Sequence, residues 1–255
     1  MPIIYRRLIH GAIAIATASL FFVLTVPAPG ERAEGIGELK PLPRRTVDSA
    51  SAGPSSSPRV SISIVPEKPH PVAPVVILHG SRDQKVIALT FDACSTTQPS
   101  RYDERITNIL LETETPATLF LGGRWMEEEP EQTKQLAAHP QFELANHTFS
   151  HPHLSQIPDD SIRRELSRTQ EIMGSLTGKQ PTLFRPPYGE YNERVVQIAS
   201  ELGLKTVQFD LASGDPDPSF SKERLVRYVT SMARNGSIIV MHINGRGWHT
   251  AEALP

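Results

Sequence analysis

From residue 75 onward, two patterns of apolar and polar positions take turns along the chain. Short apolar runs rich in β-branched residues predict strands at residues 75–78, 86–91, 117–121, 142–145, 182–184, 206–209 and 237–241. Between them, apolar residues at helical spacing predict helices at residues 102–113, 129–138, 160–176, 193–202 and 222–233. Strands that alternate with helices indicate an α/β fold built on a parallel sheet.

The sequence also predicts where one helix begins and ends, and where a further helix begins. Asp159 or Asp160 can cap the helix that runs to about residue 176, and Gly178 can close it. Residues 248–255 resemble the first turn of a further helix, and the sequence stops there. We therefore expect a sequence that is truncated, or a fragment, at its C-terminus.

The first 74 residues differ from the rest in composition. Arg6 and Arg7 precede a charge-free apolar run at residues 11–26, which predicts a signal peptide over residues 1–28. The run is shorter than the roughly 20 residues that a spanning helix needs, so an uncleaved N-terminal anchor is the alternative. Residues 29–74 are rich in Pro, Ser and Gly and predict a disordered linker. The folded domain is expected at residues 75–255.

Charge and cysteine content narrow the classes of function. A net charge of −2 and a pI of about 6.5 do not provide the excess of positive charge that is typical of nucleic-acid-binding proteins. A single cysteine, Cys94, excludes an intrachain disulfide, although export implies an oxidising compartment. The expected location is periplasmic or extracellular, with membrane attachment only if the N-terminal segment stays uncleaved.

Residues capable of chemistry fall where predicted strands end. They are Asp92, His147, Arg185, Asp210 or Asp215, and His242. In a parallel α/β barrel these positions share the carboxyl-terminal rim, where active sites are built. Two histidines four residues apart (His147 and His151), a carboxylate, an arginine and a further histidine suit metal-assisted hydrolysis. Pro152 disfavours a helix at His151, so the two histidines are expected on an irregular loop.

Four motifs resemble those of the polysaccharide deacetylase family, also called the NodB-homology domain or carbohydrate esterase family 4. They are Thr90-Phe-Asp92, His147-Thr-Phe-Ser-His151, Arg185-Pro-Pro-Tyr-Gly189 and Gly236-Ser-Ile-Ile-Val-Met-His242. Ala212-Ser-Gly-Asp-Pro216 is similar to a fifth motif, with Pro216 in place of its tryptophan. The resemblance covers about residues 86–255. It implies a distorted (β/α) barrel that removes N-acetyl or O-acetyl groups from sugars with a divalent metal, usually zinc.

The resemblance also implies a role for each matching residue. Asp92 is the general base that activates water, and Arg185 orients it. His147 and His151 hold the metal, and the Tyr188 backbone N–H donates to the oxyanion. His242 protonates the leaving amine, with Asp215 as its carboxylate partner and Asp210 in reserve. Tyr188 and Trp248 are candidates for stacking on sugar rings.

One position departs from the family. Ala93 stands where the family has a second aspartate, a metal ligand, and two histidines alone leave a catalytic zinc short of its usual three protein ligands. Four alternatives remain open: Asp92 ligates directly, Asp103 substitutes, Cys94 ligates as a thiolate, or metal binding is weak or lost. A buried, inert Cys94 is the commoner situation for a single cysteine.

The sequence thus predicts a metal-dependent hydrolase, with zinc as the expected metal, that removes N-acetyl groups from an envelope or extracellular polysaccharide or oligosaccharide. Two alternatives stay open. One is a catalytically impaired, glycan-binding domain of the same fold, suggested by Ala93 and Pro216. The other is an O-acetyl esterase or a different amidase.

Overall fold

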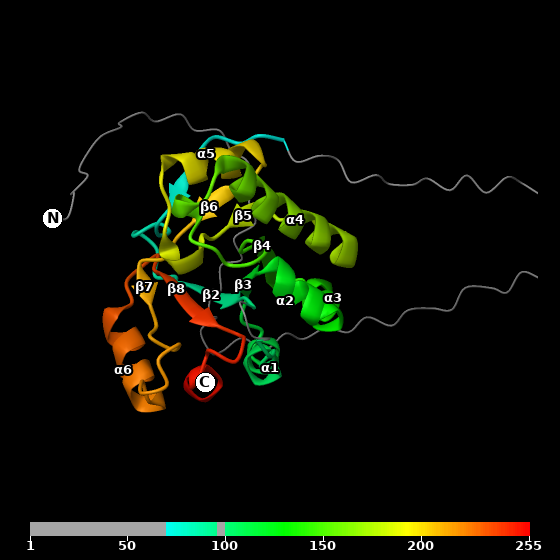
Figure 1. Ribbon diagram of the computed structural model, residues 1–255. Helices are drawn as coiled ribbons and strands as arrows, with labels where there is room; N and C mark the ends of the chain where they lie inside the picture. The colour runs from blue at the N-terminus through cyan, green and yellow to red at the C-terminus, as the bar shows by residue number, and fades with distance from the viewer. Residues whose placement is uncertain (1–69, 96–99) are drawn as a thin grey trace, which may run out of the picture. The chain divides into compact units, whose positions relative to one another are not determined.

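A parallel sheet forms the centre of the computed structural model, which describes residues 70–95 and 100–255 (Figure 1). Within these residues eight strands follow the order β1-β6-β5-β4-β3-β2-β8-β7, and all neighbours are parallel. The strands are β1 (Val76–Ile77), β2 (Ala88–Ala93), β3 (Ala117–Leu121), β4 (Phe142–Asn146), β5 (Leu183–Phe184), β6 (Lys205–Val207), β7 (Leu211–Ala212) and β8 (Ile238–His242). Strands β1 and β7 are the two ends of this order, so no ladder joins them in the described part of the chain.

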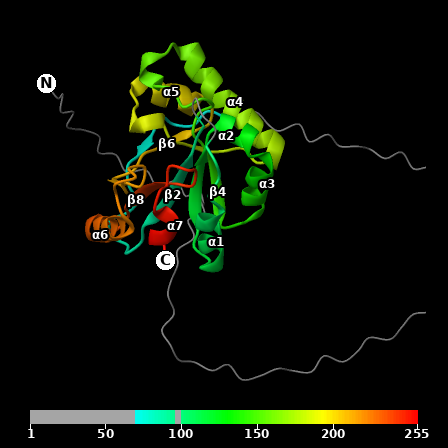
Figure 2. The same cartoon turned by 60° about the horizontal axis from the view of Figure 1, so that its bottom comes forward.

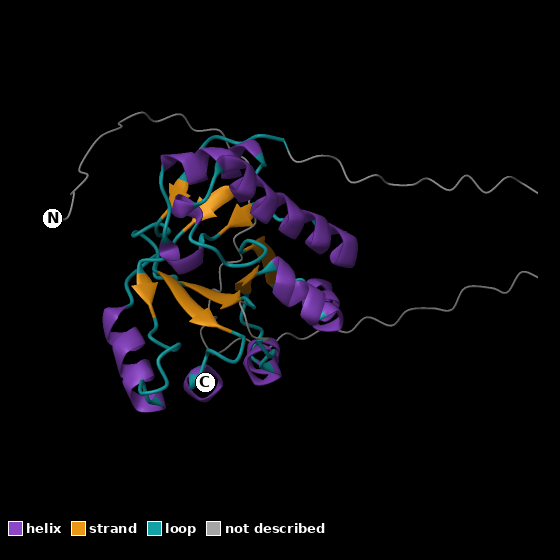
Figure 3. Cartoon of the chain, in the orientation of Figure 1, coloured by secondary structure: helices purple, strands orange, loops and turns teal. Residues whose placement is uncertain are grey.

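Helices surround the strands on the outside (Figure 3). They are α1 (Glu104–Glu112), α2 (Gly123–Glu128), α3 (Pro130–Ala138), α4 (Asp159–Thr177), α5 (Glu193–Glu201), α6 (Lys222–Met232) and α7 (Thr250–Ala253), with short 3₁₀ turns η1 (Leu154–Gln156) and η2 (Pro187–Gly189). Helix α7 packs against α1 and α6, as the turned view in Figure 2 shows. The first turn of a further helix was predicted at this end of the sequence, in a barrel expected to lack the rest of its last helix, and the four residues of α7 form that turn.

Strand β3 shows how the sheet encloses two apolar layers. Leu119 and Leu121 belong to the large cluster that contains Trp125 of α2. Phe120, between them, belongs to a separate cluster with Val207 of β6. Because successive side chains on a strand point to opposite faces, the first layer lies under the helices and the second inside the curved sheet. This is the distorted (β/α) barrel that the sequence predicts.

Most predicted elements are present, with ends that shift by one or two residues. The strand predicted at residues 117–121 is β3 itself. Helix α2 was not predicted; a Cβ at Gly123 would lie 2.6 Å from Cδ2 of Phe149, so this helix begins where only glycine fits against the neighbouring loop. Strand β7 was also missed, because Leu211 and Ala212 lie between two polar residues and form no apolar run of the kind that marks the other strands.

The ends of α4 give one confirmation and one correction. Gly178 closes the helix in the left-handed conformation, with φ of 70°, as predicted. The predicted cap by Asp159 or Asp160 is wrong: Pro158 occupies the N-cap position, and no side chain caps this end. The two aspartates lie in the first turn instead, where they interact favourably with the helix dipole.

The predicted signal peptide or anchor (residues 1–28) lies outside the described residues, as does the predicted linker up to residue 69. At residues 70–74 the chain has no helix or strand, and the Val72 N–H donates to the Ser200 carbonyl at 2.9 Å. In the described part of the chain no helix combines the length and the apolar composition needed to cross a membrane.

Candidate active site

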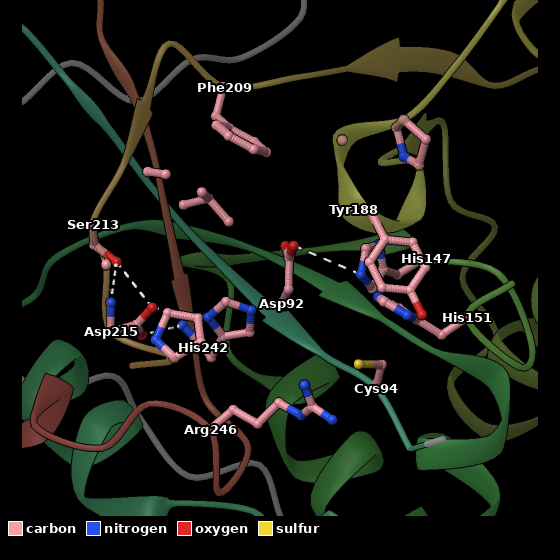
Figure 4. Close-up of a pocket in the computed structure, with 16 residues that line it drawn as sticks. Asp92, Cys94, His147, His151, Tyr188, Phe209, Ser213, Asp215, His242 and Arg246 are labelled. Atoms are coloured by element: carbon pink, nitrogen blue, oxygen red, sulfur yellow. Dashed lines mark hydrogen bonds and ion pairs between the residues drawn. The ribbon is translucent and has the colours of Figure 1, made fainter. Parts of the chain in front are cut away.

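A pocket of about 300 Å³ lies at the carboxyl ends of the strands, where the sequence places its candidate residues. Strands β2 and β8 are neighbours in a register that pairs Asp92 with His242, so both reach the same rim. Figure 4 shows these two side chains facing His147 and His151 across the pocket. The predicted site residues that line it are Asp92, His147, His151, Tyr188, Asp215 and His242.

Asp92 and Arg185 form a buried ion pair beside this pocket. Arg185 Nη1 donates to Asp92 Oδ1 at 2.8 Å, and the arginine side chain is fully buried. Its guanidinium carbon lies 4.0 Å from the centre of the Phe120 ring. Asp92 Oδ2 is 3.7 Å from His147 Nε2. Arg185 thus fixes one carboxylate oxygen and leaves the other turned toward the predicted metal pair.

The environment keeps Asp92 ionised. Burial by itself would raise the pKa of this carboxyl, but the charges of Arg185 and His242 and the hydrogen bond from Arg185 outweigh burial and hold the pKa below its ordinary value of 3.8. A carboxylate of low pKa is a weak base. It therefore accepts a proton readily only from a donor far more acidic than bulk water.

The loop that carries the two histidines is irregular, as predicted. Thr148 and His151 adopt left-handed conformations, with φ of 64° and 60°. Glu165 of α4 holds the loop by accepting the backbone N–H groups of Phe149 and Ser150 at 2.9 and 2.7 Å. The two imidazole rings consequently lie side by side, with centroids 5.0 Å apart.

Both imidazoles are in the state that binds a metal. His147 Nδ1 donates to the Arg185 carbonyl at 2.8 Å, which leaves the Nε2 lone pair free. His151 Nδ1 is buried and has no hydrogen-bond partner among the described residues. Burial lowers the pKa of both rings, that of His151 to about 3, so both are neutral at neutral pH. A buried, unpaired ring nitrogen is costly unless a ligand satisfies it, so the pair fits a metal ion.

The two residues after Asp92 lie in different environments, one in the apolar core and the other at the pocket. Ala93 is fully buried in the large apolar cluster, whereas Cys94 lines the pocket. Cys94 Sγ and one ring nitrogen from each of His147 and His151 lie within 4.8 Å of one another. Burial raises the pKa of the Cys94 thiol to about 12, so only a bound cation would displace its proton.

His242 faces the pocket with a carboxylate behind it. Its Nδ1 donates to Asp215 Oδ1 at 2.9 Å, which leaves Nε2 as the other ring nitrogen. Asp215 is almost fully buried and also accepts the His242 backbone N–H at 2.7 Å and the Thr250 hydroxyl at 2.7 Å. Burial would lower the pKa of His242, but the hydrogen bond and charge of Asp215 outweigh it and raise the pKa above 6.5.

Tyr188 lies at the pocket mouth. Its backbone is left-handed, with φ of 59°, which is uncommon for a residue with a side chain. The ring stacks on His153 with a centroid separation of 4.2 Å and meets His151 edge-on at 4.5 Å. With 54% of its surface exposed, the ring offers an aromatic face for a sugar.

Three weaker candidates lie elsewhere. Asp210 accepts from Arg82 and from the Ile238 N–H, at the opposite end of β8 from His242, so it is not the partner of that histidine. Asp103 caps α1, and its side chain pairs with Arg105. Trp248 is exposed but is not among the residues that line the pocket.

Several residues that shape the site were not found from the sequence. Ser213 and Thr250 hydrogen-bond to Asp215, Glu165 holds the histidine loop, and Asn244 contacts Cys94. Only Ser213 carried a signal, since it lies inside the segment compared with the fifth motif. Thr250 is 35 residues beyond the aspartate that it contacts, so only the tertiary structure reveals the pair.

Comparison with known proteins identifies the family. The sequence profile of polysaccharide deacetylases matches residues 79–207, about half of the chain. The chain belongs to the polysaccharide deacetylase family. A peptidoglycan-N-acetylglucosamine deacetylase of Bacillus cereus is 31% identical over 163 residues, which cover 64% of this chain and 58% of that protein. The peptidoglycan-N-acetylmuramic acid deacetylase PdaA of Bacillus subtilis is 30% identical over 178 residues, 69% of this chain and 65% of that protein. The chain thus spans less than two thirds of either relative.

Solved structures of this family share the barrel. The crystal structure of BA3943 from Bacillus anthracis, described as a carbohydrate esterase family 4 pseudoenzyme, superimposes with a TM-score of 0.64 at 28% identity. The match covers 72% of this chain and 62% of BA3943. A mutant of BA3943 with restored enzymatic activity superimposes equally well, with a TM-score of 0.64. The fold therefore occurs in both active and inactive proteins, and activity must be argued from the site.

Proposed function

We propose that this polysaccharide deacetylase domain hydrolyses N-acetyl groups of an envelope or extracellular polysaccharide with a divalent metal, zinc, held by His147 and His151. One observation carries the proposal. Asp92 backed by Arg185 and His242 backed by Asp215 face the same 300 Å³ pocket, next to the two neutral histidines. One group is ionised and the other has a raised pKa, which is the pairing that a base and an acid need.

Each residue of the site has a separate role in amide hydrolysis. When bound, the metal acidifies a water molecule and polarises the acetyl carbonyl. Asp92 Oδ2 takes a proton from the attacking water while Arg185 holds Oδ1 in place. The water oxygen bonds to the acetyl carbon, and the Tyr188 N–H donates to the developing oxyanion. His242 Nε2 then gives its proton to the sugar nitrogen, the C–N bond breaks, and acetate and a free amine leave.

The relatives support the substrate class. Two of them act, by their names, on N-acetylglucosamine and N-acetylmuramic acid units of peptidoglycan. We therefore propose an N-acetylated glycan as the substrate and an exported, periplasmic or extracellular location, with residues 75–255 as the catalytic domain. The exposed face of Tyr188 would stack against a sugar ring.

Removing the metal tests this proposal. Protein stripped with a chelator is expected to lose acetate release from N-acetylglucosamine oligomers and peptidoglycan by at least about 100-fold, because Asp92 is too weak a base for bulk water. Added zinc or cobalt is expected to restore the rate. Acetylated xylan assayed in parallel separates amide from ester hydrolysis. No acetate from any of these substrates with any metal, from protein shown to be folded, would favour a glycan-binding pseudoenzyme, which the replacement of the second aspartate by Ala93 also suggests.

The pH profile tests the role of His242. Since this histidine must be protonated to act as acid, kcat/KM falls as pH rises through its pKa. Asp215→Asn removes the charge that raises this pKa, so the basic limb of the profile is expected to move to lower pH. The charge of Asp92 also raises the pKa of His242 and that of Arg246 lowers it, but both residues are unchanged in Asp215→Asn. NMR titration of the His242 ring should show the same displacement. Asp217→Asn, at an exposed aspartate, is the control and should leave the basic limb in place.

A further inference from the structure

We infer that Cys94, as a thiolate, is the third protein ligand of the metal held by His147 and His151. The inference rests on the proposed function only in taking the two histidines as metal ligands. It resolves the shortage of ligands that Ala93 creates. Ala93 lies in the apolar core, while Cys94, one position further, reaches the pocket on the same side as Asp92.

The geometry of the three donors fits one ion. The Cys94 sulfur and a nitrogen from each histidine lie within 4.8 Å of one another. A tetrahedral zinc ion with ordinary Zn–S and Zn–N bonds places such donors about 3.5 Å apart. Small rotations of the three side chains, each displacing a donor by about 1 Å or less, would close the remaining difference.

The surroundings hold the cysteine in position. Asn244 is fully buried, donates from Nδ2 to the Cys94 carbonyl at 2.9 Å and lies 4.0 Å from Sγ. An amide N–H directed at the sulfur is the kind of outer contact that stabilises a metal thiolate. The Gly122 N–H donates to the Ala93 carbonyl at 2.8 Å, and a Cβ at Gly122 would lie 3.4 Å from Cys94 Cα. The end of β2 is therefore packed closely against the start of α2.

Ligation by Cys94 has two chemical consequences. On binding, the S–H bond breaks, the proton leaves to solvent and the sulfur pair bonds to the ion, so the thiolate carries the same single charge as a ligating aspartate. Sulfur is a softer ligand than a carboxylate, which favours zinc or cobalt over magnesium or manganese at this site. Asp92 then remains free of the metal and keeps its role as base.

Cobalt spectroscopy tests this assignment directly. The full chain is stripped of metal and titrated with Co²⁺, and the near-ultraviolet thiolate-to-cobalt charge-transfer band is recorded. Because Cys94 is the only cysteine, the band can come from no other residue. Cys94→Ser is expected to abolish the band and to weaken cobalt binding by more than about 100-fold, beyond what the loss of an outer contact costs. Cys94→Asp should recover most of the affinity without the band.

His153→Ala serves as the matched control. This histidine lies near the site but hydrogen-bonds to Glu190, and its variant should keep the band, whereas His147→Ala and His151→Ala should lose it. Stoichiometric cobalt without a charge-transfer band in the unchanged protein would overturn the assignment, and acetate release by that protein would leave the proposed function standing. A clear band from a protein that releases no acetate would support Cys94 as a ligand and contradict the proposed function.

Discussion

Asp92→Asn is expected to lower kcat/KM for acetate release by about 1,000-fold, the contribution typical of a general base. The amide retains an oxygen that accepts from Arg185 Nη1, so the contact at 2.8 Å can persist while the proton acceptor is lost. Steady-state kinetics on N-acetylglucosamine oligomers measure the effect, and thermal unfolding of the same samples shows that the variant is folded.

The metal content of Asp92→Asn shows whether Asp92 acts as a general base or as a metal ligand. If Asp92 is the base and not a ligand, Asp92→Asn should retain one equivalent of zinc and lose activity; loss of both would indicate direct ligation. Asp103→Asn is the matched control, because Asp103 caps α1 away from the pocket and should leave the rate within about twofold. Full activity in Asp92→Asn would refute the assignment of the base.

Replacement of Arg185 by methionine is expected to reduce the free energy of unfolding by about 3–5 kcal/mol, the usual cost of leaving a buried charge without its partner. Arg185 is fully buried, and Asp92 would keep a carboxylate in a site only 8% exposed. The stacking on Phe120 would also be lost. Urea unfolding, followed by circular dichroism, measures the difference.

Two further variants show that burial causes this effect. Arg194→Met removes an ion pair of the same length, 2.8 Å, between side chains that are 40% and 53% exposed, and should cost less than about 1 kcal/mol. Adding Asp92→Asn to Arg185→Met should recover part of the loss, because the unpaired charge is then gone. Equal losses from Arg185→Met and Arg194→Met would show that the pair beside the pocket has no special role in stability.

The architecture was predictable because it depends on local patterns. Apolar β-branched runs marked the strands, as at residues 117–121, and helical periodicity marked α4 and α5. Because parallel strands end at a common rim, placing Asp92 and His242 at strand ends was enough to predict that they meet. Strand β7 carries no such signal, because Leu211 and Ala212 lie between Asp210 and Ser213 and form no apolar run.

The resemblance implied Asp215 as the partner of His242, with Asp210 in reserve, and the tertiary structure shows how the two carboxylates differ. Both follow the strand near residue 207, and spacing along the chain alone does not say which carboxylate turns toward His242. The structure directs Asp210 to Arg82 and the start of β8, while Asp215 reaches the other end of that strand. A turn of a few residues reverses such a direction, so spacing along the chain cannot decide it.

By itself, the sequence determined the barrel, the rim that carries the chemistry, and the absence of a second aspartate at position 93. Only the tertiary structure decided where the residues after Asp92 lie: Ala93 belongs to the core, and Cys94 lies close to the two histidines. The physical reason is that the exit of the chain from β2 is set by packing against Gly122 and Asn244, which are remote in sequence. A ligand set assembled from distant loops depends on those contacts, whereas strand and helix patterns depend on neighbours along the chain.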